Sequence, residues 1–207
     1  PADGPDPYGD PDPAWLRIDW SERVRRIEFG GTPINYAEIG SGRPVLFVHG
    51  LGGNWQNWLE NIPRFARERR VVALDLPGFG RSPMPREPIT IDFYGRVVAE
   101  LCDRLGLAPA VLVGNSMGGY VAAEVAIAAP HAVERLMLVS SAGISQREAP
   151  RGRVLRVGRL MTYGTRSSTA QRRALAARPG TRHLILSMVV RHPTRLRPDV
   201  TLEGLMK

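Results

Sequence analysis

The sequence predicts an α/β fold in which crossover helices join the strands of a mostly parallel sheet. Three observations support this prediction. From residue 45 to residue 140, short apolar runs alternate with longer segments of helical periodicity, which is typical of parallel strands and their connecting helices. The run at 45–48 is apolar throughout, as expected of a strand buried on both faces. Another apolar run, at 111–113, stops abruptly at a serine flanked by glycines, and a helical pattern follows at once.

The N-terminal part of the chain contains a tail and a hairpin. Residues 1–14 are rich in Pro, Asp and Gly, a composition that cannot bury apolar surface, so we expect a disordered tail there. Two extended runs, at 24–29 and 33–39, flank the sequence Gly30-Gly31-Thr32. This arrangement predicts an antiparallel hairpin with a Gly-rich turn.

The strand at 45–48 opens directly into His49-Gly50-Leu51-Gly52-Gly53. Three glycines in four residues allow backbone amides to point at a ligand. Asn54 is then expected to cap a helix, and Pro63 is expected to interrupt it. Trp55 and Trp58 lie three residues apart on one face of this helix, a spacing that favours packing over substrate contact.

The next buried strand is predicted at 70–75 and is followed by Leu-Pro-Gly-Phe-Gly-Arg-Ser at 76–82. A dinucleotide-binding motif does not fit this loop, because the third glycine would fall at Pro83 and no helix opens there. Asp75 is instead expected to hold the turn through its own side chain.

The remaining core elements follow in the same alternating order. A helix is expected within 91–105, then the strand that leads to Ser116, then a helix rich in small residues that ends at Pro130, and then a strand at 133–140. Residues 15–144 are therefore predicted to form the α/β core.

Residues 145–207 differ from the core in pattern and in charge. They carry 13 Arg, one Lys and 3 acidic residues, whereas residues 1–144 carry 14 Arg and 17 acidic residues, so the net charges are +11 and −3. We expect Arg-rich helices that lie over the site. Few aromatic residues stand between the arginines, which argues against nucleic acid as a partner.

Composition excludes several other classes of function. No apolar run is long enough to cross a bilayer, and the acidic, Pro-rich start is unlike a secretory signal, so a cytoplasmic setting is expected. The single cysteine, Cys102, cannot form an internal disulfide and lies in a helical pattern, which indicates a buried, inert thiol. The sequence implies no metal and no organic cofactor, and it does not indicate an oligomeric state.

Ser116 is the candidate nucleophile. A serine on a strained turn between a strand and a helix projects its hydroxyl outward, and Gly114 and Gly118 let the neighbouring backbone approach closely. The helix that begins after Ser116 directs backbone N–H groups and the positive end of its dipole at any oxyanion formed by attack.

Three linked motifs resemble those of the α/β-hydrolase fold superfamily. They are the His-Gly loop at 49–53, the segment 75–82 and the Gly-Asn-Ser-Met-Gly-Gly segment at 114–119, each after a strand and in that order. The resemblance covers about residues 22–144. It implies that Ser116 is the nucleophile and that the backbone N–H groups of Leu51 and Met117 form the oxyanion hole. It also implies that His49, Gly50 and Gly52 shape the His-Gly loop, and that 145–207 is part of a helical cap.

The resemblance narrows the chemistry as well. A serine nucleophile argues against the branches of the superfamily that use a carboxylate, the epoxide hydrolases and haloalkane dehalogenases. Cleavage of a carboxylic ester, lactone or thioester remains, with a small hydrophobic or amphiphilic molecule as substrate. The 114–119 segment also resembles that of hydrolases that cleave carbon–carbon bonds in aromatic ring-fission products, and this stays an alternative.

The acid and the histidine of a catalytic triad are not evident in this chain. The family places them on loops after two further strands, and no such strands are predicted before residue 207. None of the four histidines, at 49, 131, 183 and 192, follows a terminal strand, and Asp75, Asp92 and Asp199 are out of place as the acid. We therefore expect a longer hydrolase cut within its cap, inactive as it stands. The alternatives are a non-catalytic protein that uses the pocket for binding and a basic interaction module formed by 145–207.

Overall fold

A computed structural model describes residues 13–142, together with residues 178 and 180. The predicted tail at 1–14 and the predicted cap at 145–207 lie almost entirely outside these residues. The boundaries predicted for both remain predictions.

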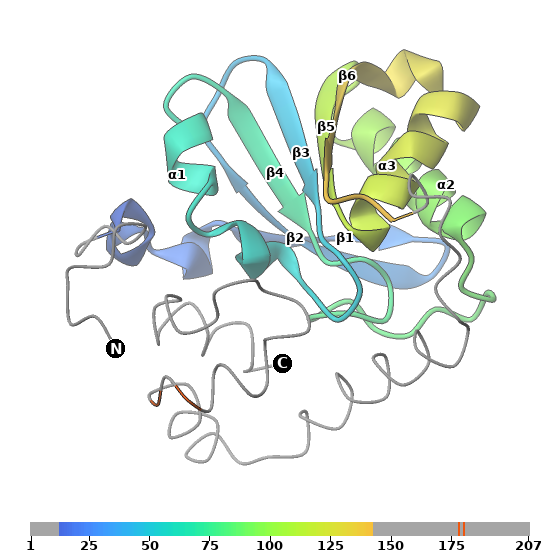
Figure 1. The fold of residues 1–207 in the computed structure, drawn as a ribbon, viewed down its shortest axis with the longest axis horizontal. Coiled ribbons are helices and arrows are strands. Elements are labelled where there is room, and N and C mark those ends of the chain that lie inside the picture. Colours follow the sequence, from blue (N-terminus) through green and yellow to red (C-terminus); the bar gives the residue numbers. More distant parts are fainter. Residues whose placement is uncertain (1–12, 143–177, 179, 181–207) are drawn as a thin grey trace.

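The described chain forms a mixed sheet of six strands with helices on both faces (Figure 1). The order of the strands across the sheet is β1-β2-β4-β3-β5-β6. Strands β3, β4, β5 and β6 are parallel to one another, whereas β2 is antiparallel to both β1 and β4. The α/β fold predicted from the alternating pattern is confirmed. The strands are β1 (Val24–Phe29), β2 (Thr32–Ile39), β3 (Pro44–Val48), β4 (Arg70–Leu74), β5 (Ala110–Asn115) and β6 (Val133–Val139).

The hairpin of β1 and β2 forms as the sequence predicts. Gly30 and Gly31 have φ angles of +51° and +79°, and two successive positive φ angles give a two-residue turn that matches the twist of paired strands. β2 then pairs with β4 through residues 36–39 and 71–74, so the hairpin extends the parallel part of the sheet at one side.

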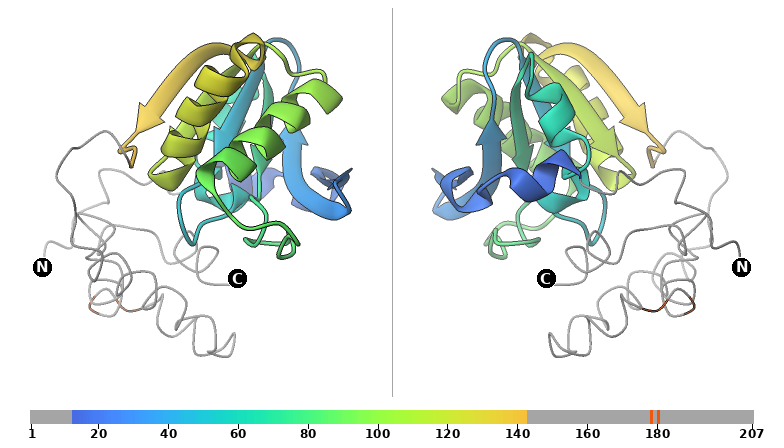
Figure 2. Two further views of the ribbon diagram at one scale, coloured as in Figure 1. Left: turned by 90° about the vertical axis from the view of Figure 1, so that its right-hand side faces the viewer. Right: turned by 90° about the vertical axis from the view of Figure 1, so that its left-hand side faces the viewer.

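Two layers of helix cover the sheet (Figure 2). The helices α2 (Ile91–Arg104) and α3 (Met117–Ala128) pack against each other and cover one face. The other face is covered by the short helices η1 (Ala14–Arg17), η3 (Trp55–Trp58) and α1 (Ile62–Phe65). The side chains of β3 alternate between these layers, with Val45 and Phe47 on the second face and Leu46 and Val48 on the first.

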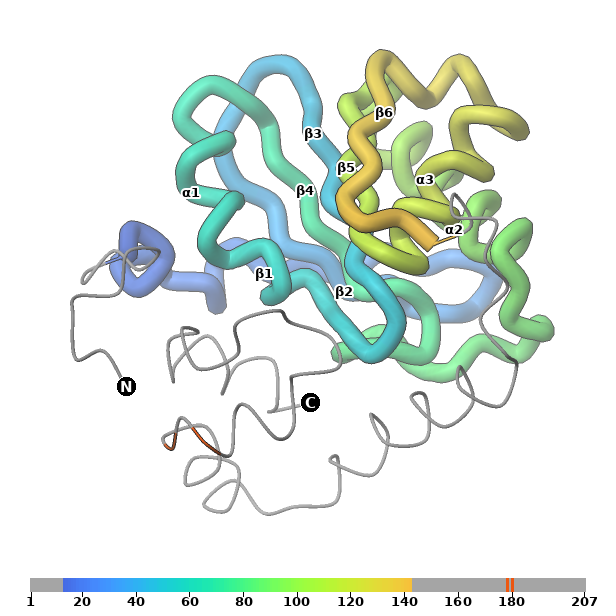
Figure 3. The backbone as a smooth tube through the Cα atoms, viewed as in Figure 1, coloured from blue at the N-terminus to red at the C-terminus, as the bar shows by residue number. Residues whose placement is uncertain are grey.

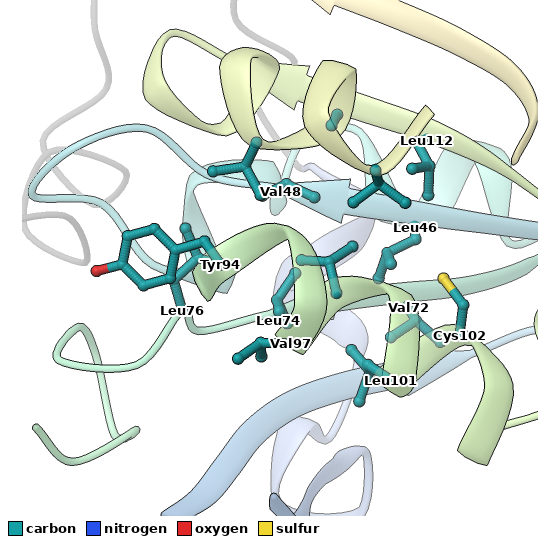
Figure 4. Close-up of a cluster of buried hydrophobic side chains, with 14 of the residues drawn as sticks. Leu46, Val48, Val72, Leu74, Leu76, Tyr94, Val97, Leu101, Cys102 and Leu112 are labelled. Atoms are coloured by element: carbon teal, nitrogen blue, oxygen red, sulfur yellow. The ribbon is translucent and has the colours of Figure 1, made fainter. Parts of the chain in front are cut away.

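The larger core lies between the sheet and helices α2 and α3 (Figure 4). Val97, Val98 and Leu101 of α2 point into it, as the helical periodicity predicts. Cys102 is fully buried in the same core, and burial raises the pKa of its thiol to about 12. A thiol with this pKa stays protonated at neutral pH, which agrees with the expectation of an inert cysteine.

The smaller core contains both tryptophans of the segment after the His-Gly loop. Trp55 and Trp58 are buried, and the Trp58 ring lies 4.7 Å from the Phe47 ring between centroids. Asn54 caps the first helix, as the sequence predicts, but the prediction of one helix here was wrong, because the chain forms two short helices instead. Pro63 does not interrupt a helix but stands in the first turn of α1, where the missing N–H of proline costs no hydrogen bond.

Strand β6 lies at one edge of the sheet, and most of its residues are exposed. Among the described strands it pairs only with β5. Its last five residues are exposed, and four of these are apolar, at positions 136–139.

Candidate active site

Ser116 lies at the apex of the turn between β5 and α3. Its φ and ψ angles are +52° and −116°, which is a strained conformation for a residue that is not glycine. The Ser116 hydroxyl does not cap α3. The backbone therefore holds this serine away from the local hydrogen bonding that a serine at a helix start usually makes.

Gly114 and Gly118 are required by the closeness of the backbone at this turn. A Cβ atom on Gly114 would lie 2.3 Å from the carbonyl oxygen of Gly118. A Cβ atom on Gly118 would lie 2.3 Å from the carbonyl oxygen of Val48 and 2.4 Å from that of His49. The missing side chains thus allow α3 to start directly against the end of β3.

The last residue of β6 and the segment just after it fix the turn from the other side. The Ser116 N–H donates to the Val139 carbonyl at 3.0 Å, and the Ser116 carbonyl accepts from the Ala142 N–H at 2.9 Å. The Asn115 side-chain amide donates to the same Val139 carbonyl at 3.1 Å. Sequence reasoning missed these residues, because backbone contacts between positions more than 20 apart leave no mark in the residue types.

The His-Gly loop at 49–53 lies against Ser116. A Cβ atom on Gly50 would lie 3.1 Å from the Ser116 Cβ atom, so the backbone of the loop packs closely against Ser116. The Gly53 N–H donates to the Gly50 carbonyl at 3.0 Å, and Gly52 has a φ of +71°, which closes a tight turn around Leu51. The loops after β3 and β4 emerge at the same end of the sheet (Figure 3).

Two backbone N–H groups belong to residues next to this contact: Met117 follows Ser116 in the chain, and Leu51 follows Gly50, the loop residue packed against Ser116. Within residues 13–142, neither the Leu51 N–H nor the Met117 N–H donates to another group. Met117 is the first residue of α3, where the helix leaves its first N–H groups without partners and its dipole favours negative charge. The arrangement can bind an oxyanion formed next to Ser116.

His49 is buried and has both ring nitrogens engaged. Its Nδ1–H donates to the Gly50 carbonyl at 2.7 Å, and its Nε2 accepts from the Leu76 N–H at 3.0 Å. These contacts fix the neutral tautomer with the proton on Nδ1. His49 thus holds the loop, and neither nitrogen is available as a proton acceptor for Ser116.

The other candidate bases and acids also lie elsewhere. His131 is in the 3₁₀ helix η4 (Pro130–Ala132), at the start of β6, and its Nε2 lies 3.3 Å from an Asp103 carboxylate oxygen on the surface. Asp92 is paired with Arg96 on the exposed face of α2. His183, His192 and Asp199 lie outside the described residues.

Asp75 is fully buried after β4 and binds three donors. Its Oδ1 accepts from the Trp55 N–H at 2.7 Å, and its Oδ2 accepts from the Asn35 side-chain amide at 2.8 Å and from the Arg81 N–H at 2.9 Å. The bond to Arg81 holds the turn after β4, as the sequence predicts. The bonds to Asn35 and Trp55 were not predicted.

No group of His, Cys, Asp and Glu side chains in the described part of the chain could hold a metal ion. None of the helices in that same part has the length and apolar character needed to span a bilayer.

Comparison with known families gives a direct assignment. The sequence profile of the alpha/beta hydrolase fold matches residues 43–199, which is more than half of the chain. The chain belongs to the alpha/beta hydrolase fold family. It therefore carries the family signature of a hydrolase enzyme, and the matched range includes the His-Gly loop, Asp75 and Ser116.

Two curated relatives illustrate the range of chemistry near this chain. The dihydrolipoyllysine-residue acetyltransferase component of the acetoin cleaving system of Pseudomonas putida is 44% identical over 124 residues, which are 59% of this chain and 34% of that protein. The 2-hydroxy-6-oxo-2,4-heptadienoate hydrolase of a Pseudomonas putida strain is 38% identical over 129 residues, 60% of this chain and 47% of that enzyme. The chain thus spans between about a third and a half of the length of these relatives.

Solved structures share the fold. A meta-cleavage product hydrolase, CumD, has a TM-score of 0.62 and 26% identity, and the match covers 90% of this chain and 68% of that one. Est816, an N-acyl homoserine lactone degrading enzyme, has a TM-score of 0.63 and 24% identity, covering 87% of this chain and 70% of that one.

Proposed function

We propose that the complete gene product is a serine hydrolase that cleaves a carboxylic ester, lactone or thioester through an acyl-enzyme on Ser116. The observation that carries this proposal is the position of Ser116 on a strained turn, beside two N–H groups that have no partner within residues 13–142. Strain that survives in a folded protein concentrates at functional sites. A serine nucleophile next to paired backbone donors is the arrangement that acyl transfer requires.

The reaction would proceed in two steps. The Ser116 oxygen attacks the acyl carbon, the hydroxyl proton passes to a general base, and the carbonyl oxygen becomes an oxyanion held by the Leu51 and Met117 N–H groups. The oxyanion then collapses and expels the alcohol or thiol, and water later hydrolyses the acyl-enzyme. Because His49 is engaged and His131 is remote, the base is proposed to come from residues outside 13–142.

The proposed substrate is a small hydrophobic or amphiphilic molecule. Leu51 supports this proposal, because its apolar side chain is 45% exposed in the loop that touches Ser116. An exposed leucine at that place gives an acyl or alkyl chain an apolar contact next to the reacting carbon.

The relatives favour a second candidate, hydrolysis of a carbon–carbon bond in a ring-fission product. Two of them, at 38% identity, are named hydrolases of 2-hydroxy-6-oxo-2,4-heptadienoate and of 2-hydroxymuconate semialdehyde. The same serine and oxyanion site would serve this reaction, so the two candidates differ in substrate rather than in fold.

The first testable prediction concerns the nucleophile. In the complete gene product, Ser116→Ala is expected to lower kcat by about 10³-fold or more, because only oxyanion binding and positioning remain. Turnover is measured with p-nitrophenyl butyrate and with 2-hydroxy-6-oxo-2,4-heptadienoate, and the faster substrate in the unchanged protein decides between the candidates. Ser21→Ala, at an exposed serine bonded to Asp19, is the control and should keep full activity. Turnover by Ser116→Ala at the unchanged rate, or no turnover of either substrate by the unchanged protein, would contradict the proposal.

A further inference from the structure

Both ends of the His-Gly loop are attached to one short segment after β4. At the start of the loop, His49 Nε2 accepts from the Leu76 N–H at 3.0 Å. Past its end, the Trp55 N–H donates to Asp75 Oδ1 at 2.7 Å. Two adjacent residues, Asp75 and Leu76, therefore hold the start of the loop and the residue just past its end.

The attachment at the start reaches the loop backbone through an imidazole. His49 Nδ1–H donates to the Gly50 carbonyl at 2.7 Å, so the ring links Leu76 directly to the residue that touches Ser116. The ring is fully buried. A buried ring with one fixed tautomer transmits the position of the Leu76 N–H to Gly50 without rotational freedom.

The attachment at the end depends on a carboxylate. Asp75 accepts three N–H donors on two oxygens, and the side chain is fully buried. An asparagine of the same shape has one acceptor oxygen and an NH₂ group. Its oxygen would face the two donors at Asn35 and Arg81, and its NH₂ would then face the Trp55 N–H, which would release the end of the loop.

We propose that Asp75 and His49 are positioning residues that aim the Leu51 N–H at the developing oxyanion. This inference rests on the proposed function, because the oxyanion forms only if Ser116 attacks an acyl carbon. Neither side chain touches the substrate in this scheme. They act in the transition state only, because the charge that the Leu51 N–H stabilises is absent from the bound substrate.

The test compares kcat with KM in the complete gene product. Removing an oxyanion donor outright lowers kcat about 10²- to 10³-fold, so a misaimed donor in Asp75→Asn is expected to lower kcat about 10- to 100-fold. KM should change less than threefold, since substrate binding in the ground state is untouched. All variants are assayed well below their melting temperatures.

Ser82→Ala is the matched control. Ser82 is buried in the same network, where its hydroxyl donates to the Asp75 carbonyl at 2.8 Å and accepts from the Asn35 N–H at 2.9 Å. Neither of these two bonds reaches the His-Gly loop or Trp55. The control should lower the melting temperature and leave kcat within threefold.

A pair of His49 variants tests the attachment at the start of the loop. The pair also replaces the first test if Asp75→Asn does not fold. His49→Gln can still accept from the Leu76 N–H, whereas His49→Asn reaches only the Gly50 carbonyl. We expect kcat of His49→Gln to exceed that of His49→Asn at least tenfold.

The outcomes separate this inference from the proposed function. If Ser116→Ala is inactive while Asp75→Asn keeps normal kcat, or while Ser82→Ala loses kcat equally, the positioning role is overturned and the function stands. Equal rates for the two His49 variants overturn the role of the imidazole. Turnover that survives in Ser116→Ala overturns both proposals together.

Discussion

Gly118, beside the site, and Gly106, an exposed residue after α2, would both be destabilised by an added side chain, but for different reasons. Gly118 has no room, because a Cβ atom would lie 2.3 Å from the Val48 carbonyl oxygen. Gly106 has space on all sides but a φ of +60°. The first glycine is fixed by its neighbours and the second by its own backbone.

The difference gives a prediction about stability. Gly118→Ala should lower the free energy of unfolding by roughly 3 kcal/mol, because backbone has to move to remove the clash. Gly106→Ala should cost only about 1 kcal/mol, the strain of a left-handed alanine. Urea unfolding of the complete gene product measures both, and equal losses would show that space at Gly118 is not the controlling factor.

At the scale of residues, the sequence identifies which side chains matter better than it identifies their partners. Ser116 and its flanking glycines stand out because their spacing is unusual, and Asp75 stands out as the last residue of a strand before a Gly-rich turn. Asp75 also binds Trp55 and Asn35, which lie 20 and 40 positions earlier. Contacts over such separations depend on the order of strands in the sheet, which no local pattern encodes.

Helix α2 begins with a side-chain cap that can be tested alone. The Thr90 hydroxyl accepts from the Phe93 N–H at 3.0 Å and satisfies one of the free donors of the first turn. Thr90→Ala should reduce the free energy of unfolding by about 1 kcal/mol, whereas Thr90→Ser should keep most of it. Thermal unfolding followed by circular dichroism distinguishes the two variants, and a full loss in Thr90→Ser would rule out the cap as the cause.

At the scale of elements, long periodic segments are predicted well and short ones poorly. Helix α2 is 14 residues long, so the helical spacing of its apolar positions, among them 97, 98 and 101, can be recognised in the sequence. The four-residue helices η3 and α1 give no such periodicity, since one turn cannot show a repeat. The sequence pattern therefore predicts a break at Pro63, whereas Pro63 lies in the first turn of the second helix, α1.

The whole fold protects Cys102, and this makes the thiol a reporter of unfolding. Because burial raises its pKa to about 12, iodoacetamide at pH 8 should modify the folded complete gene product far more slowly than the urea-unfolded protein. The sign of the pH dependence follows as well. The unfolded thiol ionises from about its ordinary pKa of 9.0, so stability falls as the pH rises from 9 toward 12. Cys102→Ala should show a flatter profile, and rapid modification of the folded protein would contradict the burial.

The exposed apolar residues of the edge strand β6 predict that the 207-residue chain associates with itself in solution. Residues 136–139 of β6 are apolar and between 36% and 50% exposed, and an open apolar strand is a template for association. We expect concentration-dependent association, measured by sedimentation velocity, that Met137→Lys reduces. Ile127→Lys is the control, because Ile127 is more exposed than Met137 but lies on α3 rather than on a strand. An equal effect of both variants would indicate general hydrophobicity rather than strand pairing.

The hydrogen bonds that Ser116 makes with the end of β6 and with Ala142 also have a consequence for the order of folding. The strained turn at Ser116 is held by carbonyl and N–H groups of Val139 and Ala142, more than 20 positions further along the chain. During synthesis from the N-terminus, the serine leaves the ribosome before the residues that hold its backbone in place. Until Ala142 has emerged and β6 has docked, the turn has no external support and can relax to an ordinary helix start. The strained turn at Ser116, the proposed nucleophile, therefore acquires its geometry only after β6 has docked, and a nascent chain released before that point would lack this backbone conformation at Ser116.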